Sequence, residues 1–246
     1  MTRARARSLR TGARVALPCM ALLLAACQRT PTTPGPAPAA PVAAATSPPP
    51  TPDATLLHID AAASRIELRV RAAGPLAPLG HAHVLQATGF SGELWLGREV
   101  GRSRLQLRLP VESFVVDDPQ ARAAAGGDFA KPLPEEARRG TREHMLGERQ
   151  LDAAHFPQIL LESSGLAVLK GDAAAGEGTM ALQATLRNRV TSLAVPVSWE
   201  QRDGTLRARG QFTLSQAALG IEPYSVGGGA LRVADDIEAR FELVAH

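Results

Sequence analysis

Apolar and polar residues alternate along much of the chain after residue 55, which is the pattern of strands with one buried face. In the segment 64–71, Ile66, Leu68 and Val70 fall on one face, and the residues between them are charged. The same alternation, or a short apolar run, recurs at 56–59, 84–90, 93–96, 104–109, 159–169, 180–187, 193–199, 206–214 and 237–243. The pattern predicts about eight or more strands.

Turn-forming residues separate these segments, at 74–75, 97–101, 117–119, 171–172, 203–204 and 227–229. Half-apolar strands joined by short turns favour an antiparallel sheet closed into a barrel, because closure leaves no exposed sheet edge. One helical insertion is expected between Pro134 and Ala154, with Thr141 as its capping residue. The sequence therefore predicts an all-β fold, an antiparallel β-barrel with a short helical insertion.

The apolar strand faces are expected to point into this barrel. A barrel in an outer membrane needs girdles of aromatic residues, and only Trp95, Trp199 and Tyr224 suit that role. Several strands also carry two or more arginines on the polar face, which a narrow lumen is too small to pair. We therefore expect the aliphatic side chains inside the barrel and the arginines in water.

Residues 1–26 are expected to be a lipoprotein signal peptide. The apolar run from Val15 to Ala26 is too short to span a bilayer, which takes about 20 residues. It ends in Leu24-Ala25-Ala26-Cys27, which resembles the lipobox of bacterial lipoproteins, where the cysteine is acylated. By that resemblance Cys27 is a lipid anchor carrying palmitate-type chains. An ordinary signal peptide that happens to contain Cys27 is the alternative.

Residues 27–54 are expected to form a disordered, Pro/Ala-rich tether, since nine prolines fall between Gln28 and Asp53. The residue after Cys27 is not Asp, which by resemblance to such lipoproteins predicts the outer membrane, facing the periplasm. Both cysteines of the chain precede residue 28, so no disulfide is expected in the folded part.

The net charge of +3 does not indicate a nucleic-acid partner. Five arginines lie within the first 14 residues, and the rest of the chain holds 22 basic and 24 acidic residues. The mature surface is therefore close to neutral. The expected partners are a hydrophobic small molecule and, through the N-terminal lipid, the membrane.

The interior of the predicted barrel is the first candidate site. A barrel of about eight strands is either filled by its own side chains or holds one small or elongated ligand. The inward positions are mostly medium-sized aliphatics and only 4% of the chain is aromatic, which favours a cavity. The candidate ligand-binding residues are Ile66, Leu68, Val70, His81, His83, Leu105, Leu107, Leu182, Phe212 and Phe241.

His81 and His83 lie two residues apart, so both rings fall on one face of an extended segment. That arrangement suits a polar ligand head group or a metal, but a metal needs a third ligand such as His144, His155 or an acid. We predict no metal and no cofactor. A metal- or haem-associated electron-transfer accessory that uses His81 and His83 stays open as an alternative, as does a structural envelope module with a filled barrel.

The sequence gives no support for catalysis. It contains no G-x-S-x-G, H-E-x-x-H or G-K-[ST] element, so no motif indicates a hydrolase or a nucleotide-binding enzyme. Gly227-Gly228-Gly229 lies between extended segments and does not open a helix, which favours a turn at the barrel rim over a phosphate-binding loop. We therefore expect a binding protein and not an enzyme.

Several short segments resemble, in order and spacing, the YceI-like family of periplasmic lipid-binding proteins. They are His58-Ile59-Asp60, the strand 64–70, Phe90-Ser91-Gly92-Glu93-Leu94, the segment 151–163, Ala218-Leu219-Gly220-Ile221 and Asp235-Asp236-Ile237. The resemblance implies an extended lipocalin-like β-barrel over residues 55–246. It also implies a polyisoprenoid ligand, such as a quinone or a polyprenyl lipid. The oligomeric state is left open.

Overall fold

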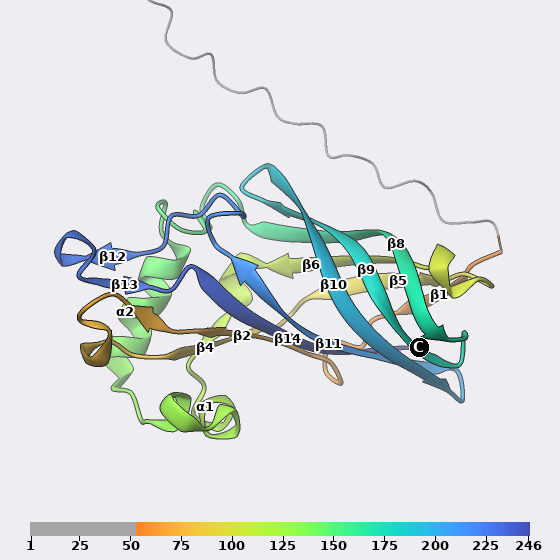
Figure 1. Cartoon of the computed structure of the whole chain (residues 1–246), viewed down its shortest axis with the longest axis horizontal. Coiled ribbons are helices and arrows are strands. Elements are labelled where there is room, and N and C mark those ends of the chain that lie inside the picture. The colour runs from red at the N-terminus through yellow and green to blue at the C-terminus, as the bar shows by residue number, and fades with distance from the viewer. Residues whose placement is uncertain (1–52) are drawn as a thin grey trace, which may run out of the picture. The chain divides into compact units, whose positions relative to one another are not determined.

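The computed structural model describes residues 53–246, and most of these residues lie in strands (Figure 1). The predicted signal peptide, Cys27 and nearly all of the predicted tether lie outside the described residues. One antiparallel sheet has the order β1-β5-β6-β8-β9-β10-β11-β14-β2-β4-β7. Its strands are β1 (Thr55–His58), β2 (Arg65–Val70), β4 (His83–Ala87), β5 (Ser91–Leu96), β6 (Arg104–Pro110), β7 (Val115–Val116), β8 (Gln158–Gly171), β9 (Ala175–Leu186), β10 (Arg189–Arg202), β11 (Thr205–Ser215) and β14 (Asp236–Ala245).

A small second sheet and several helices complete the described part of the chain. The second sheet has the order β12-β13-β3, formed by β12 (Ser225–Val226), β13 (Leu231–Val233) and β3 (Ala72–Ala73). The two α-helices of residues 53–246 are α1 (Pro119–Ala125) and α2 (Glu135–Leu146). Short 3-10 turns are η1 (Ala77–Leu79), η2 (Val100–Arg102), η3 (Val111–Ser113), η4 (Gly127–Ala130) and η5 (Gly227–Gly229). None of these helices is both long and apolar enough to cross a membrane.

The large sheet curls until its first strand meets β14. The amide of His58 donates to the carbonyl of His246 over 2.8 Å, and the amide of His246 donates back over 3.0 Å. At this end the barrel is closed by backbone hydrogen bonds. Further along, residues 238–242 of β14 pair with β2, and β7 pairs with β4, so the other half is a wide, curled sheet. The prediction of an all-β, antiparallel barrel-like fold is confirmed.

The alternation in the sequence sets the two faces of the sheet. Across β2 and β14, Ile66 is opposite Phe241 on the inner face. On the outer face every pair joins opposite charges: Arg65 with Glu242, Glu67 with Arg240, and Arg69 with Glu238. Such cross-strand pairs each contribute roughly 0.2–1 kcal/mol. A register slip of one residue would place these charges in the core, so the register is strongly determined.

The helices differ from the prediction in two respects. The helix α2 lies within the predicted interval, but it follows Pro134, and Thr141 lies inside it, donating from Oγ1 to the Ala137 carbonyl over 2.9 Å. The expected role of Thr141 as a cap is therefore wrong. The helix α1 lies where only a turn was expected, because the Asp118 carboxylate caps its first turn and a proline occupies its first position.

The outer face of β2 is not fully in water, contrary to the expectation for its arginines. Glu67 is only 3% exposed, and Arg69 donates from Nε to the Glu67 carboxylate over 2.7 Å. The Phe129 ring of η4 lies against this face, 5.6 Å from the guanidinium of Arg69 and 4.5 Å from that of Arg71. The segment with α1 and η4 thus forms an outer layer on β2 and β4, and Val84 is completely buried beneath it.

Candidate ligand-binding cavity

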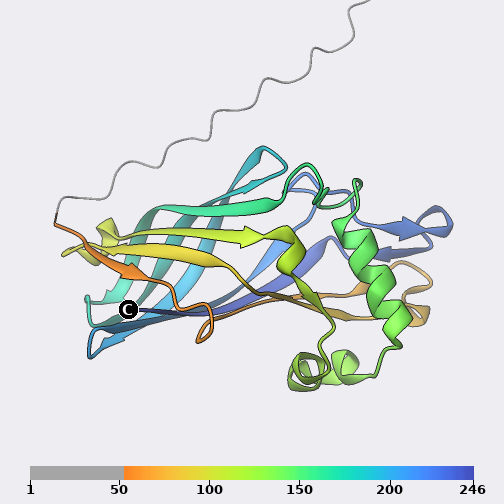
Figure 2. The ribbon, with the colours of Figure 1, turned by 180° about the vertical axis from the view of Figure 1, so that it is seen from behind.

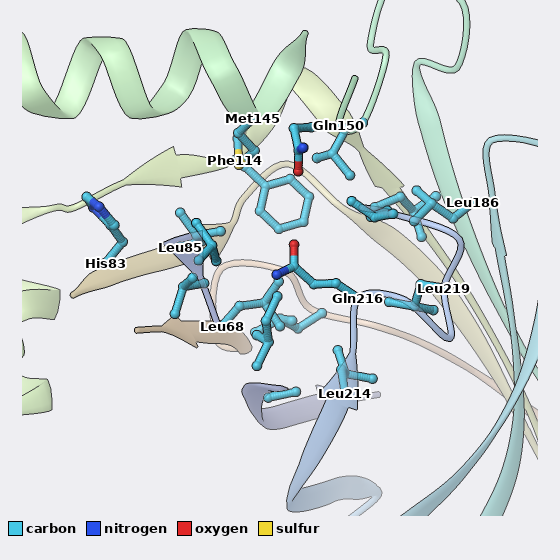
Figure 3. Close-up of a pocket in the computed structure, with 18 of the residues that line it drawn as sticks. Leu68, His83, Leu85, Phe114, Met145, Gln150, Leu186, Leu214, Gln216 and Leu219 are labelled. Atoms are coloured by element: carbon cyan, nitrogen blue, oxygen red, sulfur yellow. The ribbon is translucent and has the colours of Figure 1, made fainter. Parts of the chain in front are cut away.

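An apolar cavity of about 510 Å³ lies inside the curled sheet. Its volume is within the range of about 300–1,000 Å³ that is usual for small-molecule sites. Strands β2, β4, β6, β8, β9, β10, β11 and β14 contribute aliphatic and aromatic side chains to its wall. In Figure 3 the side chains of Leu68, Leu85 and Leu214 surround the space beside the Phe114 ring. The cavity offers a hydrophobic molecule a place out of water.

All of the residues selected from the sequence line this one cavity. The strand residues among them lie on β2, β4, β6, β9, β11 and β14, and the curl of the sheet brings these strands together. The full set is Ile66, Leu68, Val70, His81, His83, Leu105, Leu107, Leu182, Phe212 and Phe241. Their position is a structural fact, and their contact with a ligand stays a prediction.

The helix α2 crosses the end of the barrel opposite to the C-terminus (Figure 2). Its residues Thr141, His144 and Met145 line the cavity, at the spacing that places side chains on one helix face. Sequence reasoning did not select them, although this spacing was the signal available. His144, one of the residues considered as a third metal ligand in the alternative reading, stacks on Tyr224 with ring centroids 4.5 Å apart.

A rim of exposed and half-buried side chains lines the cavity at this end, and we define it as Leu79, His81, His144, Tyr224, Val226 and Leu231. Leu79 is 72% exposed and Val226 is 42% exposed, so large aliphatic side chains contact water beside the opening. The triple glycine, as expected, forms a turn between two short strands, β12 and β13, beside this rim. Apolar groups at the opening lower the cost of passing a hydrophobic molecule from a lipid phase into the cavity.

The two sequence-selected histidines lie close together at the cavity. Their ring centroids are 6.3 Å apart and the rings are nearly perpendicular. Within residues 53–246 no group of three or more His, Cys, Asp or Glu residues is arranged to hold a metal ion. One of the two rings has a different partner: Nδ1 of His83 lies 2.6 Å from the Asp117 carboxylate.

Asp117 is completely buried and connects His83 to a buried arginine. Its carboxylate accepts hydrogen bonds from the Val84 amide over 2.9 Å and from the Arg122 guanidinium. Burial alone raises the pKa of this carboxyl, but the hydrogen bonds from His83, the Val84 amide and Arg122 outweigh it and hold the pKa below its ordinary value. An ionised carboxylate only accepts, so Nδ1 of His83 must be the donor, which fixes the orientation of the ring.

The Arg122 side chain is held by more than this ion pair. It is 4% exposed and donates to the carbonyls of Ala82 and Lys131, each over 2.7 Å. It therefore connects the chain before β4 to the end of η4. Sequence reasoning missed Asp117 and Arg122, because the aspartate was assigned to a turn and lies 34 residues from His83.

A curled antiparallel sheet around an apolar cavity defines a barrel-like protein with a small-molecule-sized interior. The YceI-like domain model matches residues 57–245, and the chain therefore belongs to the YceI-like family. The resemblance found in the sequence is confirmed. No curated protein matches the sequence.

Solved structures agree with this assignment at the level of fold. BcnA from Burkholderia cenocepacia is 18% identical, with a TM-score of 0.56 over 76% of this chain and 99% of BcnA. A polyisoprenoid binding domain from Saccharophagus degradans, implicated in plant cell wall breakdown, is 10% identical. Its TM-score is 0.51, over 77% of this chain and 97% of that domain.

Proposed function

We propose that this protein binds a hydrophobic, isoprenoid-type ligand, a quinone or a polyprenyl lipid, inside its barrel and catalyses no reaction. The apolar cavity of about 510 Å³ in a YceI-like domain carries the proposal. Burial of such a chain contributes roughly 25 cal/mol per Å² of apolar surface removed from water, and nearly the whole wall is hydrocarbon. The polyisoprenoid binding domain from Saccharophagus degradans, which shares the fold, supports this ligand class.

The cavity also bears on the two alternative functions, a structural envelope module and an electron-transfer accessory. A filled barrel, which a purely structural envelope module requires, fits poorly with an open interior of this size. The electron-transfer alternative relies on His81 and His83, and elemental analysis of the purified protein for zinc, copper and iron addresses it directly. Lipid binding needs neither histidine as a metal ligand. A bound lipid without metal therefore supports lipid binding, and a bound metal supports the electron-transfer alternative.

Lipid extraction tests the binding proposal. The Cys27→Ser variant of the full chain, purified without detergent, is expected to carry an isoprenoid lipid at up to one molecule per chain, detected by mass spectrometry of an organic extract. A protein recovered empty is then offered geranylgeraniol, and binding is followed by titration calorimetry. Absence of both a co-purified lipid and measurable binding would contradict the proposal.

We further propose that Cys27 is acylated and anchors the protein to the outer membrane, facing the periplasm. The segment 27–54 is then a tether, and its residues 28–53 have a reach of roughly 80 Å at about 3.1 Å per residue. Cys27→Ser is expected to move the protein from the membrane fraction to the soluble fraction, measured by fractionation and immunoblotting. Cys19→Ser is the matched control and should stay with the membrane; release of both variants, or of neither, argues against the anchor.

A further inference from the structure

Two glutamine side chains enter the mostly apolar cavity from different elements. Gln216 follows directly after β11, and Gln150 lies in the loop after α2. Figure 3 shows the two amide groups on either side of the space beside the Phe114 ring, with their oxygen atoms turned toward that space. They are polar groups within a region lined by Leu68, Leu214 and other hydrocarbon side chains, so their hydrogen-bonding state decides which ligand fits.

Backbone hydrogen bonds fix which end of each amide faces the cavity. Nε2 of Gln216 donates to the Ala234 carbonyl over 2.8 Å, and Nε2 of Gln150 donates to the Glu222 carbonyl over 3.0 Å. A carbonyl only accepts, so a flipped amide would set two acceptors against each other. The nitrogen atoms are thus held by the backbone, and the oxygen atoms are the groups offered to a ligand.

The two oxygen atoms have no donor of their own. Gln216 is only 6% exposed, yet within residues 53–246 no N–H or O–H group donates to its Oε1 or to the Oε1 of Gln150. A ligand that fills the cavity displaces the water that can reach these oxygen atoms, and an acceptor left without a partner is then unfavourable unless the ligand supplies a donor. The cavity wall at the two glutamines is therefore matched to a ligand with a donor.

The arginines that would favour an anionic head lie at the margin of the cavity and have other contacts. Arg71 and Arg232 are exposed, and the guanidinium of Arg71 lies over Phe129 on the outer side of the sheet. Arg240 forms an ion pair with Glu238. A prenyl phosphate held at such exposed groups would leave the two glutamine oxygens unpaired. A phosphate group placed between the two glutamines would bring its negative charge against two acceptor oxygens, which is unfavourable.

We propose that Gln150 and Gln216 form an acceptor pair that selects isoprenoids ending in a hydroxyl group over ether, ketone or phosphate forms of the same chain. A hydroxyl donates to one amide oxygen, while an ether or ketone oxygen offers no hydrogen and meets only acceptors. This inference rests on the proposed function and narrows it to a class of ligand. It assigns to the two glutamines the selection of the head group and to the strand side chains the binding of the hydrocarbon chain.

The test compares one hydrocarbon chain with three head groups. Geranylgeraniol, its methyl ether and its monophosphate are titrated into the Cys27→Ser full chain by calorimetry. The alcohol is expected to bind about tenfold more tightly than the ether or the phosphate, a ratio that corresponds to about 1.4 kcal/mol. In Gln216→Met the alcohol-to-ether ratio should fall to near one.

Two further variants make the result decisive. Gln150→Met, in a loop, should lower the same ratio even if Gln216→Met fails to fold. Gln211→Met is the matched control, because Gln211 lies on the outer face of β11 and donates to Glu238, and it should keep the ratio of the unsubstituted protein. Equal binding of alcohol and ether, or tighter binding of the phosphate, overturns the selection but leaves the proposed function. No binding of any of the three overturns both.

Discussion

Replacing Arg122 with Met is expected to lower the free energy of unfolding by about 3–5 kcal/mol, because it leaves the Asp117 carboxylate buried without its cation. Asp117 is completely buried, so water cannot take the place of the guanidinium. The carbonyls of Ala82 and Lys131 also lose a donor. Urea unfolding of the Cys27→Ser chain, followed by circular dichroism, measures the loss.

A matched control separates the burial of this charge from the general effect of removing an arginine. Arg139 on α2 is 61% exposed and lies 3.9 Å from Glu143, so Arg139→Met should cost about 0.5 kcal/mol or less. Adding Asp117→Asn to Arg122→Met should recover part of the stability, since a neutral amide is cheaper to bury than an unpaired carboxylate. A loss in Arg122→Met no larger than that in Arg139→Met would refute this account.

The strands and the lining of the cavity were predictable because both follow from local periodicity. Ile66, Leu68 and Val70 alternate with charged residues, so they share one face of β2. When the sheet curls with its apolar face inward, the apolar side chains of all its strands meet in the interior. The turn at Asp203-Gly204 was also predictable, since both residues have positive φ in a two-residue hairpin. At Arg187-Asn188 the same turn type occurs with less typical residues, and the sequence pattern did not mark it.

The polar parts of the site were not predictable, because they depend on contacts between distant segments. The amide of Gln216 is oriented by Ala234, and that of Gln150 by Glu222, 72 residues away. Asp117 and Asp118 with Pro119 are typical both of a turn and of a helix start, and only the folded chain decides between them. The sequence thus predicted where hydrocarbon would be buried, and the structure adds which hydrogen-bonding groups lie within it.

Filling the cavity should weaken the binding of an isoprenoid at least about tenfold, with little loss of stability. Ala184 lies on β9, lines the cavity and is 4% exposed, so in Ala184→Trp the indole occupies space that the ligand would use. Overpacking a solid core costs about 1–3 kcal/mol, and an existing cavity lowers that cost. We expect the Kd for geranylgeraniol, measured by titration calorimetry, to rise by at least about tenfold.

The outer face of the same strand provides the control for this substitution. Ala181 is exposed, and its side chain points away from the cavity, so Ala181→Trp adds the same indole without entering the interior. Its Kd for geranylgeraniol should match that of the unsubstituted protein. If Ala184→Trp folds and binds as tightly as Ala181→Trp, the ligand does not occupy this cavity, and the binding site must lie on another surface of the barrel.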